Sequence, residues 1–342
     1  MDLVIRADAN SHIGTGHIMR CLALAQAWKT RGGQVAFVSF CDSDALCQRI
    51  EGEGMQVVRL GGSYPDPEDL DVTFQVLSER SGAWLVLDGY NFDSEYQYRI
   101  KESRHRLLAV DDTALVDHYY ADIIVNQNIN AQRLHYPCEQ SSRLLLGTKY
   151  VMLRSEFLAY RGLKRKISKV ASKVLITLGG ADPNNQTLKV LRALQYGKME
   201  GIEARIVLGA CNRRFKGVQL STSGSKQKLR VLRDVRNMPE LMAWADIAVS
   251  AAGSTSWELA FMGVPFLTTI LAPNQEIIAK GLGEATAAIN LGWLQAISEV
   301  ALAQYLADFI HRWEVRLQVS LKARKLVDGL GAERIIACLM ER

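Results

Sequence analysis

The first group of candidate catalytic and ligand-binding residues lies in the turn after the predicted first strand. This turn, Asp8 to Arg20, reads DANSHIGTGHIMR. Gly14 and Gly16 allow the backbone to approach a ligand closely, and a helix is predicted to begin near His17. The unpaired N–H groups and positive dipole end of such a helix favour phosphate or another anion. His17 is a candidate acid–base group, because imidazole can accept or donate a proton near neutral pH. Alternatively, the turn only reverses the chain and His17 is a solvent-facing residue of the first helical turn.

The spacing of this turn differs from the dinucleotide-binding pattern GxGxxG. Met19 stands where the third glycine belongs, and no acidic residue closes the second predicted strand near Val38–Phe40. Both features are needed to bind the pyrophosphate and the ribose of a dinucleotide. The sequence therefore disfavours a nicotinamide cofactor, and we predict an enzyme without a cofactor.

A second segment of this kind is SAAGSTSWELAFMGVP, residues 250–265. A strand is predicted to run into a turn of small residues, after which a helix begins with Ser254 or Thr255 as its cap. Hydroxyls and free N–H groups there can hold a diphosphate, and Glu258, one turn later, can accept hydrogen bonds from both hydroxyls of a ribose. The alternative is a capping box, in which Glu258 bonds back to the N–H of Thr255.

Three weaker features lie at other predicted strand ends. The stretch 179–185, GGADPNN, is either a helix cap or the frame of an anion site. Asp88 and Tyr90 end a buried strand, where a carboxylate either points toward a ligand or only forms a turn. Asn274 and Gln275 begin a helix, and their amides suit hydrogen bonds to sugar hydroxyls or cap that helix.

Short apolar strands alternate with helical stretches along the whole chain, which predicts parallel sheets covered on both faces. The expected strands are 3–7, 34–40, 55–60, 84–90, 107–112 and 122–127, then 173–180, 204–209, 229–235, 246–252, 265–271 and 287–292. Helices are expected at 17–31, 43–53, 94–105 and through most of 298–342. The predicted fold is α/β, with two Rossmann-like doubly wound domains that face a cleft. Ligands bind such sheets beyond the carboxyl ends of the strands.

The predicted domain boundaries follow from where this pattern pauses and restarts. We expect an N-terminal domain over 1–154, a basic linker over 155–172 and a C-terminal nucleotide-binding domain over 173–325. Residues 326–342 are expected to form a helix that packs back on the N-terminal domain.

Composition excludes several classes of protein. Of the 342 residues, 48% are hydrophobic and 23% charged, which excludes a disordered chain. No apolar run is long enough to span a membrane and no signal peptide is recognisable, so we expect a cytoplasmic protein. The net charge of +5 suits a small anionic substrate and is too dispersed for a nucleic-acid partner. The six cysteines lack zinc-site spacing, so no metal is predicted, and we expect a monomer.

These motifs, in this order, resemble nucleotide-sugar enzymes of the GT-B fold. GxGHxxR follows the first strand, and SxxGSxSxELAxxGVP is similar to the UDP-binding region of the peptidoglycan N-acetylglucosaminyltransferases. The chain resembles more closely the PseG/SpsG-like UDP-sugar hydrolases of pseudaminic acid biosynthesis. That resemblance runs nearly end to end and includes IRADANSHIGTGHIMRCLALA, VDD…DIIVNQN, LLGTKYVMLRSEF and TLGGADPNN.

The resemblance implies hydrolysis of UDP-2,4-diacetamido-2,4,6-trideoxy-β-L-altropyranose, or a close UDP-sugar, to UDP and the free sugar. In that family water attacks the anomeric carbon, and no metal is needed. His17 would be the catalytic histidine, Ser254 and Thr255 would hold the diphosphate, and Glu258 the ribose. Further expected substrate contacts are Gly14, Thr15, Gly16, Arg20, Asp88, Tyr90, Gly180, Asp182, Met238, Gly253, Asn274 and Gln275.

Two other functions fit parts of the same pattern. A GT-B glycosyltransferase would use the same UDP pocket with a lipid or sugar acceptor. Such enzymes usually carry a basic and apolar face for docking to a membrane, which 17–31 and 43–53 do not show. A non-catalytic protein that binds nucleotide sugars would not depend on His17.

Overall fold

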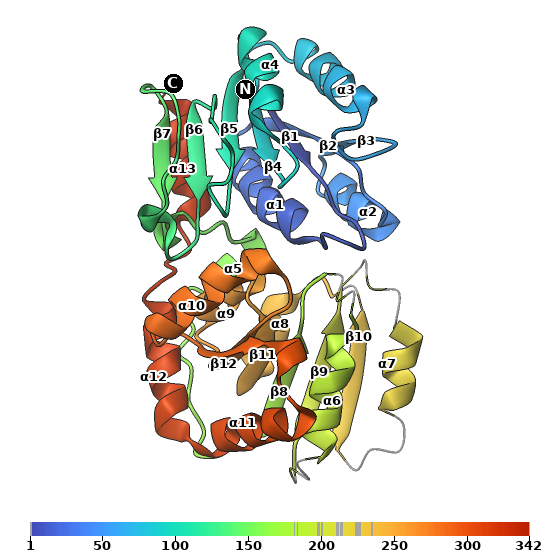
Figure 1. The fold of residues 1–342 in the computed structure, drawn as a ribbon, viewed down its shortest axis with the longest axis vertical. Coiled ribbons are helices and arrows are strands. Elements are labelled where there is room, and N and C mark those ends of the chain that lie inside the picture. The colour runs from blue at the N-terminus through green and yellow to red at the C-terminus, as the bar shows by residue number, and fades with distance from the viewer. Residues whose placement is uncertain are drawn as a thin grey trace. The chain divides into compact units, whose positions relative to one another are not determined.

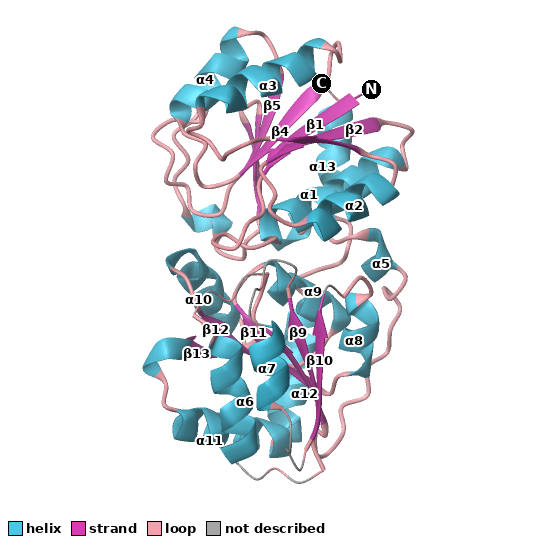
Figure 2. Ribbon diagram, turned by 90° about the vertical axis from the view of Figure 1, so that its right-hand side faces the viewer, coloured by secondary structure: helices cyan, strands magenta, loops and turns pink. Residues whose placement is uncertain are grey.

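The computed structural model describes residues 2–180, 182, 184–196, 199, 201–209, 212, 215–222, 227–233 and 235–341. Two compact units divide the chain. Unit 1 comprises 1–155 and 329–342, and unit 2 comprises 156–328. Each unit is built on one parallel β-sheet with helices on its faces (Figures 1 and 2).

Unit 1 contains a seven-stranded sheet in the order β3-β2-β1-β4-β5-β6-β7. The strands are β1 (Asp2–Ala7), β2 (Gln34–Ser39), β3 (Gln56–Arg59), β4 (Trp84–Asp88), β5 (Arg106–Val110), β6 (Ile123–Asn126) and β7 (Arg143–Leu146). The helices are α1 (Gly16–Lys29), α2 (Asp44–Gly52), α3 (Pro67–Ser78), α4 (Ser94–Glu102) and α13 (Gly331–Met340). The order reverses between β1 and β4, and in doubly wound sheets that point is where ligands bind.

The side chains of β1 alternate between two buried layers. Leu3 and Ile5 belong to the core that α1 and α13 cover, whereas Val4 belongs to the core on the other face, under α3 and α4. Alternation between two buried faces explains why residues 3–5 of the strand are all apolar. Figure 2 shows α3 and α4 on one face of this sheet and α1, α2 and α13 on the other.

Unit 2 contains a six-stranded parallel sheet in the order β10-β9-β8-β11-β12-β13. The strands are β8 (Lys173–Thr177), β9 (Glu203–Leu208), β10 (Lys228–Arg233), β11 (Ile247–Ala251), β12 (Phe266–Ile270) and β13 (Ile289–Trp293). The helices are α5 (Ser155–Leu158), α6 (Gln186–Tyr196), α7 (Phe215–Ser221), α8 (Met238–Trp244), α9 (Ser254–Met262), α10 (Glu276–Glu284), α11 (Glu299–His311) and α12 (Trp313–Arg324). Here too the order reverses at the first strand, between β8 and β11.

The basic segment that follows α5 is held to the rest of unit 2 by a half-buried arginine, Arg165, and a buried one, Arg316. Arg165 donates hydrogen bonds to the carbonyl oxygens of Met242, Ala245 and Met262, at the ends of α8 and α9. Arg316 of α12 donates to the carbonyl oxygens of Ser168 and Lys169. These arginines satisfy backbone carbonyls that would otherwise remain unpaired.

A buried ion cluster crosses the α3/α4 face of unit 1. Arg6, a cation near the carboxyl end of β1 with no exposed surface, forms ion pairs with Asp69 of α3 and with Asp8. Its Nε lies 3.0 and 3.1 Å from the two carboxylate oxygens of Asp69. The Tyr96 hydroxyl donates to Asp69 Oδ1 over 2.9 Å. A buried charge is tolerated only when it is paired in this way.

Replacing Asp69 by asparagine should therefore destabilise the fold by about 3–5 kcal/mol, because Arg6 then loses a buried counter-charge. The free energy of unfolding from denaturant titration measures the effect. Asp71→Asn is the matched control, since Asp71 lies on the same helix with its side chain exposed. Equal stability of the two variants would show that the Arg6–Asp69 pair contributes little.

Candidate functional site

A cluster of polar side chains lies at the carboxyl edge of the sheet of unit 1. Asp88 is the last residue of β4, which lies between β1 and β5. His17 comes from the first turn of α1, and Asp112 follows β5 by two residues. Because the carboxyl ends of neighbouring parallel strands meet at one edge, these residues converge although they lie far apart in the sequence.

His17 and Asp88 form a hydrogen-bonded pair. Nδ1 of His17 lies 2.6 Å from Oδ1 of Asp88, and the histidine side chain is only 8% exposed. Burial alone would raise the pKa of Asp88, but the charges and hydrogen bonds of Arg20 and His17 outweigh burial and hold it below its usual range. An ionised carboxylate can only accept, so Nδ1 carries the proton and the lone pair of the neutral imidazole is on Nε2.

Arg20, one helical turn after His17, links the two carboxylates. Its Nε and Nη2 each donate to Asp88 over 2.7 Å, and its Nη1 donates to Asp112 Oδ1 over 2.7 Å. The thiol of Cys21 also donates to Asp88, over 3.2 Å. Burial raises the pKa of this thiol, which keeps it protonated as a donor. The carboxylate of Asp88 is thus held in one orientation by three side chains of α1.

Asp112 extends the hydrogen-bonded cluster to two further side chains, those of Asn128 and Tyr90. Its Oδ1 also accepts from Nδ2 of Asn128 over 2.7 Å, and its Oδ2 accepts from the Tyr90 hydroxyl over 2.9 Å. The Tyr90 ring meets the imidazole of His17 edge to face, with 4.8 Å between ring centres, and Tyr90 is 47% exposed. Neither Asp112 nor Asn128 was among the site residues expected from the sequence, although both lie in the VDD and VNQN motifs.

This arrangement suits general-base catalysis. A carboxylate that fixes Nδ1–H orients the ring and stabilises the imidazolium that forms when Nε2 takes a proton. Among the described residues, no hydrogen bond engages Nε2 of His17. With His17 neutral, Asp88, Asp112 and Arg20 sum to one negative charge, which an imidazolium would balance. The cluster therefore has the charges to accommodate an imidazolium, and Nε2 is the atom that would take the proton of a reacting water or hydroxyl.

The glycine turn before α1 is held in a fixed shape. Oδ1 of Asn10 accepts from the backbone N–H groups of His12 and Ile13, and the N–H of Gly14 donates to the carbonyl of Asn10. Gly14 has a φ of 77°, a conformation that glycine adopts without strain. Thr15, the residue before α1, makes no side-chain capping bond, unlike Ser43 before α2. The first N–H groups of α1, including that of Gly16, therefore lack a capping side chain.

The corresponding turn of unit 2 lies between β11 and α9. Our prediction that Ser254 or Thr255 caps α9 is wrong by one or two positions. Gly253 is the N-cap, its carbonyl accepts from the N–H of Ser256, and no side chain caps the helix. Thr255 lies within the first turn of the helix and is not its N-cap. The glycine leaves these N–H groups accessible, because a Cβ at Gly253 would contact no described residue within 4 Å.

Two other predicted nucleotide contacts come from neighbouring helices of unit 2. Glu258 lies in the second turn of α9 with 9% of its surface exposed. Met238 is the first residue of α8, a helix capped by Asn237, and it too is 9% exposed. Contacts between α8 and α9 bring these two positions onto adjacent helices.

The remaining unit 2 residues that were expected to contact the substrate interact with neighbouring parts of the fold. The carboxylate of Asp182 accepts from the N–H groups of Gln186 and Thr187 at the start of α6, as a helix cap does; Ala181 and Pro183 of the predicted segment lie outside the described residues. Gly180 lies in contact with Gly209, where side chains would prevent the approach of the two backbones. Oε1 of Gln275 accepts from the N–H of Leu271 over 2.9 Å and so folds back on the end of β12. Asn274 precedes it in the same 3-10 turn.

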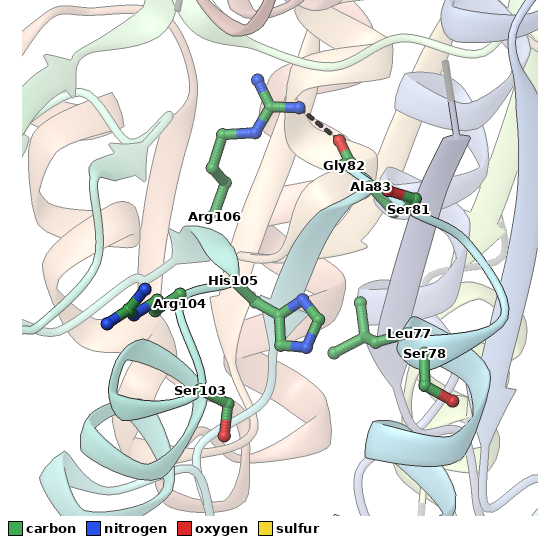
Figure 3. Close-up of a pocket in the computed structure, with 9 residues that line it drawn as sticks. All are labelled: Leu77, Ser78, Ser81, Gly82, Ala83, Ser103, Arg104, His105 and Arg106. Carbon is green, nitrogen blue, oxygen red and sulfur yellow. Dashed lines mark hydrogen bonds between the residues drawn. The ribbon is translucent and has the colours of Figure 1, made fainter.

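A cavity of about 320 Å³ lies at the opposite edge of the unit 1 sheet (Figure 3). It is lined by Leu77, Ser78, Ser81, Gly82, Ala83, Ser103, Arg104, His105 and Arg106. Figure 3 shows Arg104 turned away from His105, while Arg106 is bonded to the carbonyl of Gly82. Helices α3 and α4 end here, and the negative dipole ends of helices disfavour an anion. This cavity is not the candidate site.

The described residues carry neither a metal-ligand cluster nor a membrane-spanning helix. They contain no group of three or more His, Cys, Asp or Glu side chains placed to hold a metal ion. None of their helices is long and apolar enough to cross a membrane.

The predicted resemblance to nucleotide-sugar enzymes is confirmed by comparison with known sequences. Residues 173–325 match the glycosyltransferase family 28 C-terminal domain. The chain is 25% identical to the spore coat polysaccharide biosynthesis protein SpsG of Bacillus subtilis, over 100% of this chain and 98% of that protein. It is 25% identical to the UDP-2,4-diacetamido-2,4,6-trideoxy-β-L-altropyranose hydrolase of Campylobacter jejuni, over 83% of this chain and 97% of the hydrolase.

A third relative is an uncharacterized protein of Methanocaldococcus jannaschii, 26% identical over 78% of this chain. The matched part spans only 54% of the length of that protein. Among solved structures, MurG of Acinetobacter baumannii covers 100% of both chains with a TM-score of 0.64 at 15% identity. The chain therefore has the GT-B fold, as predicted, with two Rossmann-like units.

Proposed function

We propose that the chain hydrolyses a nucleotide sugar, UDP-2,4-diacetamido-2,4,6-trideoxy-β-L-altropyranose or a close UDP-sugar, to UDP and the free sugar. The reaction would belong to the biosynthesis of a nonulosonate such as pseudaminic acid. The observation that carries the proposal is the His17–Asp88 pair, in which Nδ1 is held by an ionised carboxylate and Nε2 has no hydrogen-bond partner among the described residues. The similarity to the Campylobacter jejuni hydrolase supplies the substrate class.

In the proposed reaction the oxygen of a water molecule attacks the anomeric carbon of the sugar. His17 Nε2 takes a proton from that water, and the bond between the anomeric carbon and the phosphate oxygen breaks with its electron pair passing to UDP. A positioned general base contributes about 10²- to 10⁴-fold to such a step. Asp88 stabilises the imidazolium until the proton returns to solvent.

We propose that unit 2 binds the UDP portion. The uncapped N–H groups of α9, with Ser254 and Thr255 in its first turn, would hold the diphosphate, while Glu258 would hold the ribose and Met238 the uracil. The start of α1, which also lacks a capping side chain, would likewise favour an anionic group. Backbone N–H groups that stabilise developing negative charge contribute several kcal/mol each in enzymes of other classes. On this account UDP can leave without the help of a metal ion.

A single assay separates this function from its alternatives. Purified protein is incubated with the UDP-sugar in the presence of EDTA, and release of UDP is followed by phosphorus NMR. Release of UDP without any acceptor, at the same rate with EDTA as without it, supports metal-free hydrolysis. Release only after addition of a lipid or sugar acceptor supports a glycosyltransferase, which the GT-B fold and the family 28 domain also accommodate. Binding without turnover supports a nucleotide-sugar-binding protein.

Replacing Glu258 by alanine should weaken UDP binding by about 1–3 kcal/mol, because the ribose hydroxyls lose a charged hydrogen-bond acceptor. Isothermal titration calorimetry with UDP measures the change. Glu314→Ala serves as the control, since Glu314 is exposed on α12 of the same unit. The same affinity in both variants would remove Glu258 from the ribose site.

A further inference from the structure

Asp112 is a buried carboxylate that the proposed reaction does not itself use. It lies two residues after β5 and is 5% exposed, and its hydrogen bonds go to side chains other than that of His17. Its oxygens nevertheless accept hydrogen bonds from Arg20, Tyr90 and Asn128. The first two of these side chains also touch the imidazole of His17.

The cluster places three charges around one imidazole. Nη2 of Arg20 lies 3.3 Å from Nδ1 of His17, so the guanidinium opposes a positive charge on the ring. Asp88 favours that charge through its hydrogen bond to the same nitrogen. If Asp88 were the only carboxylate paired with Arg20, the guanidinium would neutralise most of its negative charge. Asp88 would then stabilise a positively charged His17 only weakly. Asp112 changes this balance because it binds Nη1 of the same guanidinium over 2.7 Å.

The charges around Asp112 agree with this geometry. Burial would raise the pKa of Asp112, but the charges of Arg20 and His17 lower it below its usual value.

We propose that Asp112 is a positioning residue that shares the guanidinium of Arg20 with Asp88, so that Asp88 keeps the negative charge that holds and stabilises a protonated His17. This role rests on the proposed function of His17 as a general base. The titratable and charged groups of the described residues around the imidazole are Arg20 and Cys21 of α1, Asp88 of β4, Tyr90 after β4, and Asp112 after β5.

The test is the titration of the His17 imidazole by NMR in histidine-labelled protein, with the signal assigned through His17→Asn. Asp112→Asn keeps the size of the side chain but removes its charge. The titration midpoint should then move to lower pH by about one unit, the usual effect of losing a nearby opposite charge. Arg20→Gln should move the midpoint in the opposite direction, and Asp112→Glu should restore it.

An unchanged midpoint in Asp112→Asn, or a shift in the same direction as in Arg20→Gln, would overturn the proposal. Tyr90→Phe removes a hydrogen bond to Asp112 but no charge, and it should leave the midpoint nearly in place. If Asp112→Asn does not fold, Arg20→Gln still decides, because an unchanged midpoint there contradicts the shared guanidinium.

The NMR titration requires no substrate, so it stands apart from the proposed hydrolysis. If the protein proves not to turn over UDP-sugars, the shifts in the two variants still test the role of Asp112. If the protein does turn over UDP-sugars, the acid limb of the pH profile of kcat/KM should shift together with the titration midpoint of His17. Activity requires unprotonated Nε2, so the limb should lie at lower pH in Asp112→Asn and at higher pH in Arg20→Gln.

Discussion

Replacing His17 by asparagine should reduce turnover of the UDP-sugar at least about a hundredfold, the low end of the contribution of general acid–base catalysis. An asparagine side chain cannot accept a proton from the attacking water at neutral pH. UDP affinity should be nearly unchanged, because the proposed nucleotide contacts come chiefly from unit 2. Turnover is measured by UDP release, and affinity by calorimetry.

His12→Asn is the matched control for this experiment. His12 lies in the same glycine-containing turn with its side chain exposed, and its backbone N–H is bonded to Asn10. This variant should retain full turnover. If His17→Asn were as active as His12→Asn, His17 would have no part in the mechanism and the proposed reaction would lose its base.

Asp88→Asn should have an effect of similar or greater size, a loss of about 10²- to 10⁴-fold in kcat. The Nδ2 group of an asparagine at this position can donate to Nδ1 of His17, which would move the proton to Nε2 and leave no lone pair for the water. The corresponding substitution in the Ser-His-Asp triad of a serine protease costs about 10⁴-fold for this reason. Steady-state kinetics at pH 7 measures the effect.

The same substitution also removes a counter-charge from buried Arg20, so the folded state of the variant must be verified by thermal unfolding. Asp93→Asn provides the comparison. Asp93 caps α4 by accepting from the N–H of Tyr96, and asparagine caps a helix about as well as aspartate. That variant should keep both stability and turnover. A folded Asp88→Asn protein with normal kcat would exclude the tautomer-fixing role of Asp88.

Most strands of both sheets could be predicted from sequence because each depends on a local apolar run between breakers. The strand expected at 84–90 is β4, and the strand expected at 246–252 is β11. The helix α3 was not identified. Asp69 occupies its buried face and interrupts the apolar pattern, and the partner that makes this burial possible, Arg6, lies 63 positions away.

Pairing between residues far apart in the sequence also limited the prediction of the candidate site. His17, Arg20, Asp88 and Tyr90 were expected because they belong to the glycine turn or end a buried strand. The structure brings these four side chains together. Asp112 was missed because its role depends on Arg20, 92 positions away in the sequence. Non-local pairing of polar side chains leaves no periodic signal in a sequence.

In the proposed reaction, water attacks the anomeric carbon of a UDP-sugar with His17 as the base. Hydrolysis in water enriched in oxygen-18, followed by mass spectrometry of both products, tests it most directly. We predict that the label appears in the released sugar and that UDP remains unlabelled. Label in the phosphate of UDP would show attack at phosphorus and would contradict the account.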